Sequence, residues 1–144
     1  MVTTRARLVL ESLSEGLRFR GADDNGRSIL LDSGEGAVAP SPVVALLLAL
    51  GGCSGMDVIG ILRKQRQHVT AYAIELVGQR RDEHPRSFTA IEVVHHLSGE
   101  GLDPQAVADA IELSDTRYCS VHATLVPGVT VSSRFVIAPS GPGV

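Results

Sequence analysis

The first third of the chain alternates apolar and polar positions, which predicts β-strands. In one stretch Leu17 and Phe19 alternate with Arg18 and Arg20, the pattern of a half-buried strand. The sequence Asp23-Asp24-Asn25-Gly26 predicts a turn, because Asn-Gly favours a two-residue hairpin connection. The strands expected in this part of the chain include residues 8–10, 17–20 and 28–31.

From residue 41 onward the pattern becomes that of a helix. Ser41 is expected to be the N-cap and Pro42 the first helical residue. The run 43–50 is apolar all round, which is typical of a centrally buried helix, although periodicity alone also allows a buried strand. We expect one long helix or two segments over about residues 41–67. Glycines inside it indicate that another backbone or a ligand approaches closely; they are Gly51, Gly52, Gly55 and Gly60.

Strand patterns return after this helix and are interrupted by a second helical region. Asp103 and Pro104 are expected to open that helix, and a break near Ser114 allows another short helix that carries Cys119. Because strands and helices are segregated, an α+β domain with an antiparallel sheet is favoured. No linker or repeat divides the chain, so residues 1–144 are expected to form a single domain. The later strands are expected at 69–78, 88–97 and 129–137.

Composition limits the class of protein. The chain has 144 residues, of which 44% are hydrophobic and 20% charged, with a net charge of −3. It can therefore build a core, and the lack of a large basic patch argues against nucleic acid as a partner. The longest apolar run is far shorter than the ~20 residues that cross a membrane, and no secretory signal is recognised. We expect a cytoplasmic protein without a membrane partner.

The chain contains two cysteines, each in an unusual local sequence. Cys53 lies in Gly-Gly-Cys-Ser-Gly, and Cys119 lies in Arg-Tyr-Cys-Ser-Val. In the cytoplasm such a pair is more often redox-active or simply buried than a permanent disulfide. If the helix restarts near Gly52, its N-terminus favours the Cys53 thiolate, whereas Asp57 would oppose ionisation. Arg117 is a possible cation beside Cys119.

Other interpretations of the same residues stay open. Free cysteine is often a small buried hydrophobe. The pattern around Cys53 also fits a nucleophile elbow, for which Asp115 and His122 would complete a cysteine hydrolase. His95 and His96 point to opposite faces of their strand, which indicates structural roles. Because two cysteines need two suitably spaced histidines to make a structural zinc site, we predict neither a metal nor an organic cofactor.

Taken together, these segments resemble the OsmC/Ohr family, named for osmotically inducible protein C and organic hydroperoxide resistance protein. The matching stretches are Pro40-Ser41-Pro42 leading to Leu-Gly-Gly-Cys-Ser-Gly-Met-Asp-Val, and Leu113-Ser114-Asp115 leading to Arg-Tyr-Cys-Ser-Val. The resemblance covers nearly the whole chain and points to an uncharacterised branch of the family. It implies an OsmC-like α+β fold, with antiparallel sheets around central cysteine-bearing helices in an intertwined homodimer. The apolar helix agrees, because such helices are often buried between subunits.

The resemblance also implies a function. Family peroxidases reduce organic hydroperoxides in oxidative-stress defence, with their active sites at the dimer interface. Carried over to this chain, Cys53 is the thiol that attacks the peroxide and becomes a sulfenic acid. Cys119 is the resolving thiol, and a cellular dithiol is the reductant. An arginine from the N-terminal strands serves the thiolate in the family, and Arg18 and Arg20 are the candidates here.

One departure from the family pattern bears on that function. Family peroxidases carry a glutamate just after the proline that starts the central helix, where it holds the active-site arginine. Here Pro42 is followed by Val43, Val44 and Ala45, and Glu35 lies upstream in a loop. Without an arginine clamp the thiolate is less stabilised and the peroxide less polarised. This departure keeps open an alternative, a non-catalytic protein of the same fold that binds ligands or senses redox change.

Overall fold

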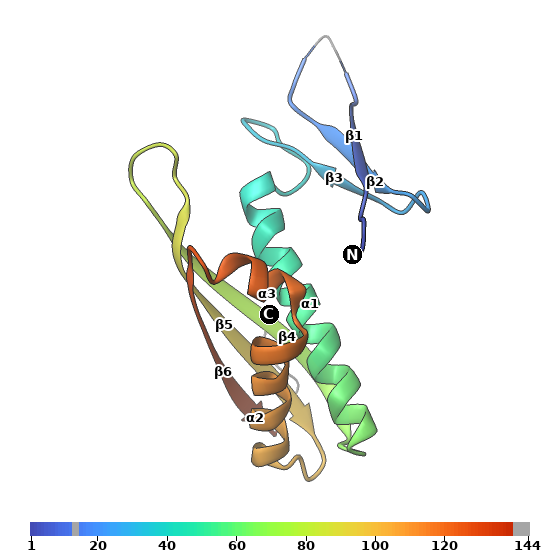
Figure 1. The fold of residues 1–144 in the computed structure, drawn as a ribbon, viewed down its shortest axis with the longest axis vertical. Coiled ribbons are helices and arrows are strands. Elements are labelled where there is room, and N and C mark those ends of the chain that lie inside the picture. The colour runs from blue at the N-terminus through green and yellow to red at the C-terminus, as the bar shows by residue number, and fades with distance from the viewer. Residues whose placement is uncertain (13–14, 140–144) are drawn as a thin grey trace. The chain divides into compact units, whose positions relative to one another are not determined.

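The computed structural model describes residues 1–12 and 15–139. Two compact units divide the chain, Met1–Leu46 and Leu47–Val144, and each is considered by itself (Figure 1). Strands and helices are segregated along the sequence, so the predicted α+β class is confirmed. Whether the chain behaves as a single domain stays a prediction.

The first unit contains a three-stranded antiparallel sheet. Its strands are β1 (Ala6–Leu10), β2 (Phe19–Asp23) and β3 (Ser28–Leu31), in the order β1-β2-β3. The strands predicted at 8–10 and 28–31 are confirmed, but β2 contains only residues 19–20 of the strand predicted at 17–20, and the predicted two-residue hairpin turn is wrong. Four residues, 24–27, connect the strands, and the Asp23 amide donates to the carbonyl of Arg27 at 3.0 Å. Gly26 adopts a φ of 78°, a conformation that is unfavourable for residues with a side chain.

A single helix, α1 (Pro42–Lys64), follows this sheet. The Ser41 hydroxyl accepts a hydrogen bond from the amide of Val44 at 3.3 Å, which confirms the predicted N-cap. The helix is continuous through the glycines, so the possible restart near Gly52 and the possible strand at 43–50 are both wrong. Only one side of α1 is buried within the chain, by Leu50, Gly51, Ser54, Gly55, Val58 and Leu62.

Within the described residues, α1 is also the one helix long and apolar enough to span a membrane by length and composition alone. Its packing indicates a different role. Val58 and Leu62 are fully buried in the hydrophobic core, and Asp57 lies in the middle of the helix. We therefore interpret α1 as the core helix of this fold.

The second unit contains a mixed sheet of β4 (Val69–Arg80), β5 (Phe88–Gly99) and β6 (Thr130–Ala138), in the order β4-β5-β6. Strands β4 and β5 are antiparallel, as predicted, but β5 and β6 are parallel. The expectation of a purely antiparallel sheet is therefore wrong at this pair. A parallel pair needs a crossover connection, and the segment between β5 and β6 is long enough to provide one. The crossover consists of α2 (Pro104–Leu113), the π-helix η1 (Ser114–Tyr118) and α3 (Ser120–Leu125).

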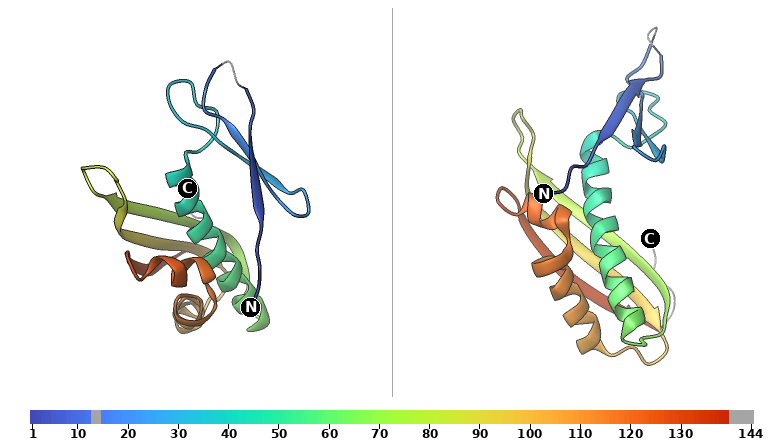
Figure 2. Two further views of the ribbon diagram at one scale, coloured as in Figure 1. Left: turned by 45° about the horizontal axis from the view of Figure 1, so that its top comes forward. Right: turned by 45° about the vertical axis from the view of Figure 1, so that its right-hand side comes forward.

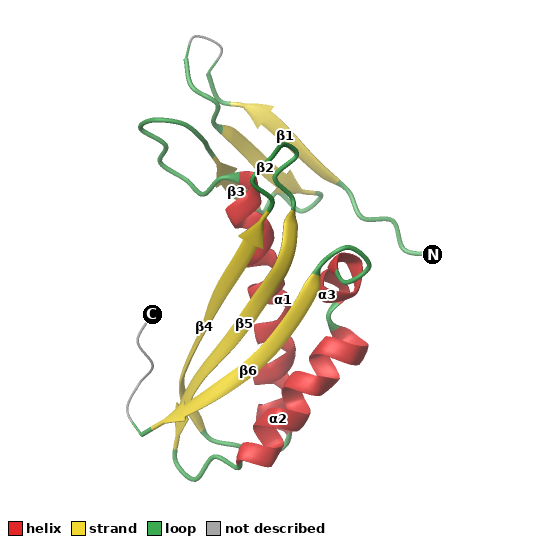
Figure 3. Ribbon diagram, turned by 90° about the vertical axis from the view of Figure 1, so that its left-hand side faces the viewer, coloured by secondary structure: helices red, strands yellow, loops and turns green. Residues whose placement is uncertain are grey.

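Helices α1 and α2 cover one face of this sheet, as Figures 2 and 3 show. The core between them is formed by Val58, Leu62, Leu97, Val107, Ala110 and Ile111. Asp103 caps α2 through a hydrogen bond from the amide of Gln105 at 2.9 Å, and Pro104 is its first residue, as predicted. His95 of β5 is fully buried, whereas His96 is only half-buried.

Two of the four glycines explain how α1 lies so close to β4. A Cβ atom on Gly51 would meet Leu76 Cδ1 at 2.7 Å, and one on Gly55 would meet Ile74 Cδ1 at 2.6 Å. Gly52 has no atom within 4 Å of such a Cβ. The predicted close approach is therefore real at two positions, and it is made by side chains of β4.

Candidate functional site

Helix α1 places Cys53 and Asp57 on the same face, because residues four apart are neighbours on a helix surface. Cys53 is half-buried and lies in the interior of the helix, where no free backbone N–H groups are available. Cys53 therefore does not lie at a helix N-terminus, and the effect predicted for a helix that restarts near Gly52 does not apply. Asp57 is also half-buried.

Cys119 is positioned by the π-helix η1. The amide of Cys119 donates to the carbonyl of Ser114, five residues back, at 2.9 Å. Such single-turn π-helices are often found at functional sites. Cys119 then becomes the N-cap of α3, and its Sγ accepts a hydrogen bond from the amide of His122 at 3.3 Å. The residue is 3% exposed, so its thiol is almost completely shielded from solvent.

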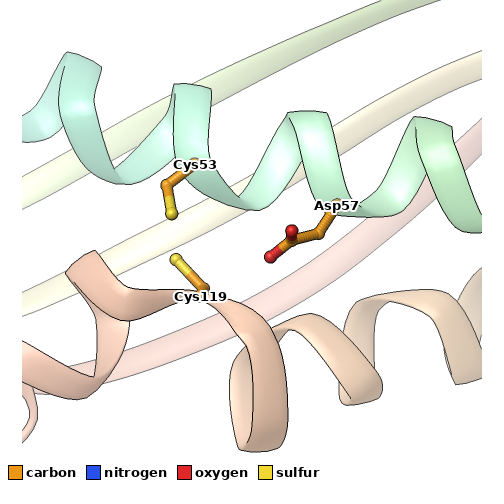
Figure 4. Close-up of side chains that lie close together, drawn as sticks. All are labelled: Cys53, Asp57 and Cys119. Carbon is orange, nitrogen blue, oxygen red and sulfur yellow. The ribbon is translucent and has the colours of Figure 1, made fainter. Parts of the chain in front are cut away.

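The two thiols and the Asp57 carboxylate meet between α1 and the start of α3, with their side chains pointing toward one another (Figure 4). One ligand atom from each of the three residues lies within 4.8 Å of the others. Both cysteines are free thiols. The structure therefore brings together the two residues that the sequence singled out.

The surroundings of Cys119 oppose its ionisation. Burial raises the pKa of the Cys119 thiol to about 11, and the neighbouring Cys53 and Asp57 shift that pKa in the same direction. The amide of His122 opposes this shift, but only in part. Cys119 is consequently a neutral thiol at pH 7. The half-buried Cys53 is the more accessible of the two sulfurs.

A pair of buried serines supports the site, and the sequence did not single out either as functional. Ser114 Oγ donates to Asp57 Oδ2 at 2.9 Å and lies 3.5 Å from the hydroxyl of Ser54. Both serines are at most 1% exposed. A signal was present, since Ser114 occupies a core-facing position of the helical pattern and a buried hydroxyl there needs a partner.

The cations that the sequence proposed have other partners nearby. In the first unit, the Arg20 guanidinium donates to Glu11 at 2.9 Å. Arg18 lies near Asp32, whose pKa is lowered by the amides of Val38 and Ser33 and further by the Arg18 charge. The roles of Arg18 and Arg20 in the site stay predictions.

In the second unit, Arg117 lies over the ring of Tyr118, with 5.6 Å from its guanidinium carbon to the ring centre. It is therefore engaged with that ring beside the site.

The histidines do not form a hydrolase site. A nucleophile elbow requires a strand-to-helix turn, and Cys53 lies inside a continuous helix, so that interpretation is wrong. His95 Nδ1 is 2.6 Å from the hydroxyl of Tyr72, and burial lowers the pKa of His95 to about 4. His95 is therefore neutral at pH 7 and is paired with Tyr72 within the core.

An open groove of about 500 Å³ reaches the site from the side of Asp57. It is lined by residues of α1, α2 and η1, among them Met56, Asp57, Gly60, Leu113 and Tyr118. Small solutes and ions therefore have access to the carboxylate, although Cys119 itself is buried.

Comparison with known proteins identifies the family. The sequence model of the family described as OsmC-like protein matches residues 33–134. The chain belongs to the OsmC family. One relative in the OsmC family is the protein YhfA of Escherichia coli strain K12. It is 42% identical over 123 residues, which cover 85% of this chain and 92% of YhfA.

Solved structures share the OsmC fold over nearly the whole chain. A hypothetical protein from Aquifex aeolicus VF5 is 30% identical with a TM-score of 0.83, over 96% of this chain and 98% of that one. The organic hydroperoxide resistance protein OhrB of Bacillus subtilis is 14% identical, with a TM-score of 0.61 over 94% and 98% of the two chains. The predicted OsmC-like fold is therefore confirmed.

Proposed function

We propose that this protein is a thiol-dependent peroxidase that reduces organic hydroperoxides and acts in oxidative-stress defence. The observation that carries the proposal is the pair of free thiols, with one ligand atom of each within 4.8 Å of the other. OsmC family membership supports it, and a protein of the same fold is named for organic hydroperoxide resistance.

The proposed cycle begins at the accessible thiol. Cys53 Sγ attacks the terminal peroxide oxygen, the O–O bond breaks, and the alcohol leaves with a proton, which gives a Cys53 sulfenic acid. The Cys119 thiol then attacks the oxidised sulfur, so a disulfide forms and water leaves. A cellular dithiol reduces that disulfide by exchange and is itself oxidised. The cycle balances as one peroxide and one dithiol converted to an alcohol, water and a disulfide.

Peroxide consumption by the purified, fully reduced protein tests this proposal. Stopped-flow oxidation is followed with cumene hydroperoxide and with hydrogen peroxide, and free thiols are counted afterwards. We expect rapid loss of both thiols, faster with the organic peroxide. Oxidation by the native protein no faster than that of the Cys53→Ser variant would contradict the proposal.

The second candidate is a non-catalytic protein of this family that binds ligands or senses redox change. It is favoured by the start of α1, whose first turn carries no acidic residue that could hold an arginine. Thiol reactivity discriminates between the two functions. A Cys53 that reacts with a small alkylating reagent at pH 7 no faster than free cysteine supports a binding role.

We also propose that the protein forms a homodimer. Apolar side chains stay exposed on α1, where Leu48 is 54% and Met56 is 76% exposed. They border a largely apolar groove of about 400 Å³ between α1 and β4. Exposed apolar patches of this kind are typical of subunit interfaces. The mass of one chain is 15.2 kDa. Light scattering coupled to size-exclusion chromatography is expected to give twice this mass, and a monomer at all concentrations would contradict the dimer.

A further inference from the structure

The candidate site contains the donor set of a transition-metal site as well as a thiol pair. Two cysteine sulfurs and one carboxylate oxygen, from Cys53, Cys119 and Asp57, lie within 4.8 Å of one another. We propose that the reduced protein binds one Zn²⁺ ion through these three side chains. No cysteine and histidine spacing in the sequence indicates this site, because its third ligand is an aspartate one helical turn from Cys53.

The separations between the ligand atoms fit this ion after a small movement. With Zn–S distances of about 2.3 Å and Zn–O distances of about 2.1 Å, tetrahedral coordination sets the ligand atoms about 3.6–3.8 Å apart. From separations of at most 4.8 Å, each pair therefore needs to close by no more than about 1.2 Å. A movement of this size lies within the range of rotation about side-chain bonds.

The chemistry of the donors selects the ion. Thiolates favour zinc over magnesium or calcium, and a carboxylate is an accepted third ligand. Two thiolates and one carboxylate carry three negative charges, which a divalent ion largely offsets. Among the described residues, no ion pair engages the Asp57 carboxylate, so that charge is free to meet a cation.

The surroundings of the ligands resemble those of established metal sites. Ligating carboxylates are usually held by a hydrogen bond, and here the buried Ser114 hydroxyl donates to Asp57 at 2.9 Å. The Cys119 sulfur accepts from the amide of His122, which stabilises negative charge on sulfur. The groove at Asp57 offers the entry path that a metal site needs.

Three protein ligands leave the fourth position of a tetrahedral ion open to water. The ion would also hold both sulfurs that the proposed peroxidase cycle uses, so Zn²⁺ and peroxide compete for the same thiols. The metal site does not require the peroxidase to be correct, because its geometry and donors stand by themselves.

Zinc titration of the reduced full-length protein tests the proposal. The protein is kept reduced with a phosphine, and Zn²⁺ is titrated in competition with a chromophoric chelator. We expect one Zn²⁺ per chain. Asp57→Asn and Cys53→Ser are each expected to weaken binding by more than about a hundredfold, the upper limit for loss of an outer partner. Ser114→Ala is expected to weaken it by about tenfold.

The matched control is Asp82→Asn, which removes an exposed carboxylate from the loop between β4 and β5 and is expected to leave Zn²⁺ affinity unchanged. Cys119 is buried, so its part is read without a substitution, by binding Co²⁺. Charge-transfer absorption of the native protein is expected to show two thiolates, and that of Cys53→Ser only one. Far-ultraviolet circular dichroism of each metal-free variant verifies that it is folded.

Three results would overturn the site. They are native binding no tighter than that of Cys53→Ser, unchanged affinity in folded Asp57→Asn, and a cobalt spectrum with a single thiolate in the native protein. Each can be obtained whether or not the protein consumes peroxide, so failure of the metal site and failure of the peroxidase are distinguishable.

Discussion

The two thiols lie within reach of each other but in opposite kinds of structure. Cys53 sits in the interior of a regular helix and is half-exposed. Cys119 follows a π-helix, caps a short helix and is 3% exposed. A regular element thus carries the accessible sulfur, whereas the buried sulfur follows an irregular element. This difference suggests a division of labour, in which access to peroxide belongs to Cys53 and protection until needed belongs to Cys119.

The largest expected effect is the difference in sulfenic-acid formation between the two variants that each keep one cysteine. In Cys119→Ser, Cys53 is still accessible, so one equivalent of organic peroxide is expected to oxidise it, and the sulfenic acid stays unresolved. In Cys53→Ser, the buried Cys119 is expected to give no sulfenic acid on the same timescale. Mass spectrometry after trapping with a sulfenic-acid reagent measures both.

Equal labelling of the two variants would remove the distinction between an attacking and a resolving thiol. The double variant, Cys53→Ser with Cys119→Ser, is the background control.

The second effect concerns pH. Because burial raises the pKa of Cys119 from 9.0 to about 11, its thiolate fraction at pH 7 is roughly a hundredfold below that of an unperturbed cysteine. Alkylation of Cys119 in the native protein, followed by mass spectrometry of its peptide, is expected to be slower by about that factor. Its rate should rise about tenfold per pH unit toward pH 11.

The same shift affects stability. The folded state holds the Cys119 proton more tightly than the unfolded state does, so this contribution is complete below about pH 9. It is lost as the pH rises from 9 toward 11. Urea unfolding with a chelator present should show a fall over that range in the native protein and a flatter profile in Cys119→Ser. A stability that increases with pH there would contradict the assignment.

The smallest effect tests how firmly α1 holds Cys53. Alanine at Gly55 adds a Cβ at 2.6 Å from Ile74 Cδ1, whereas alanine at Gly52 meets no atom within 4 Å. Both gain about 1 kcal/mol of helix propensity, and only Gly55→Ala also requires the far end of the Ile74 side chain to move, at a cost of about 1 kcal/mol, the low end of overpacking. We expect Gly55→Ala to be less stable than Gly52→Ala by that amount, measured by urea unfolding. Equal stabilities of the two variants would mean that the Ile74 side chain of β4 moves aside at no measurable cost.

Much of the architecture was predictable because local patterns set it. Period-two alternation located the strands, and Ser41 and Asp103 marked the helix starts through their capping chemistry. The parallel pairing of β5 with β6 was not predictable in this way. It depends on where the chain returns after α2, which no local pattern encodes.

The site was predictable in part for the same reason. The two cysteine motifs identified the thiols, but their proximity arises from the tertiary packing of α1 against the crossover. The role of Ser54 was hidden, since an isolated serine gives no sequence signal of burial, whereas the helical spacing placed Ser114 toward the core without showing its partner Asp57. The π-helix escaped prediction too, because one extra residue in a turn leaves the helical pattern nearly unchanged.

The spacing along α1 has one more consequence. Gly51 and Gly55 are four residues apart and face β4, while Cys53 and Asp57 are four residues apart and face the start of α3. The two packing glycines and the two site residues therefore alternate along α1, with the second pair offset from the first by two residues. A single inserted or deleted residue between positions 52 and 56 would turn the later members by about 100° and separate both sets together. Homologues with this site should accordingly vary in the sheet loops while keeping the length of this segment unchanged.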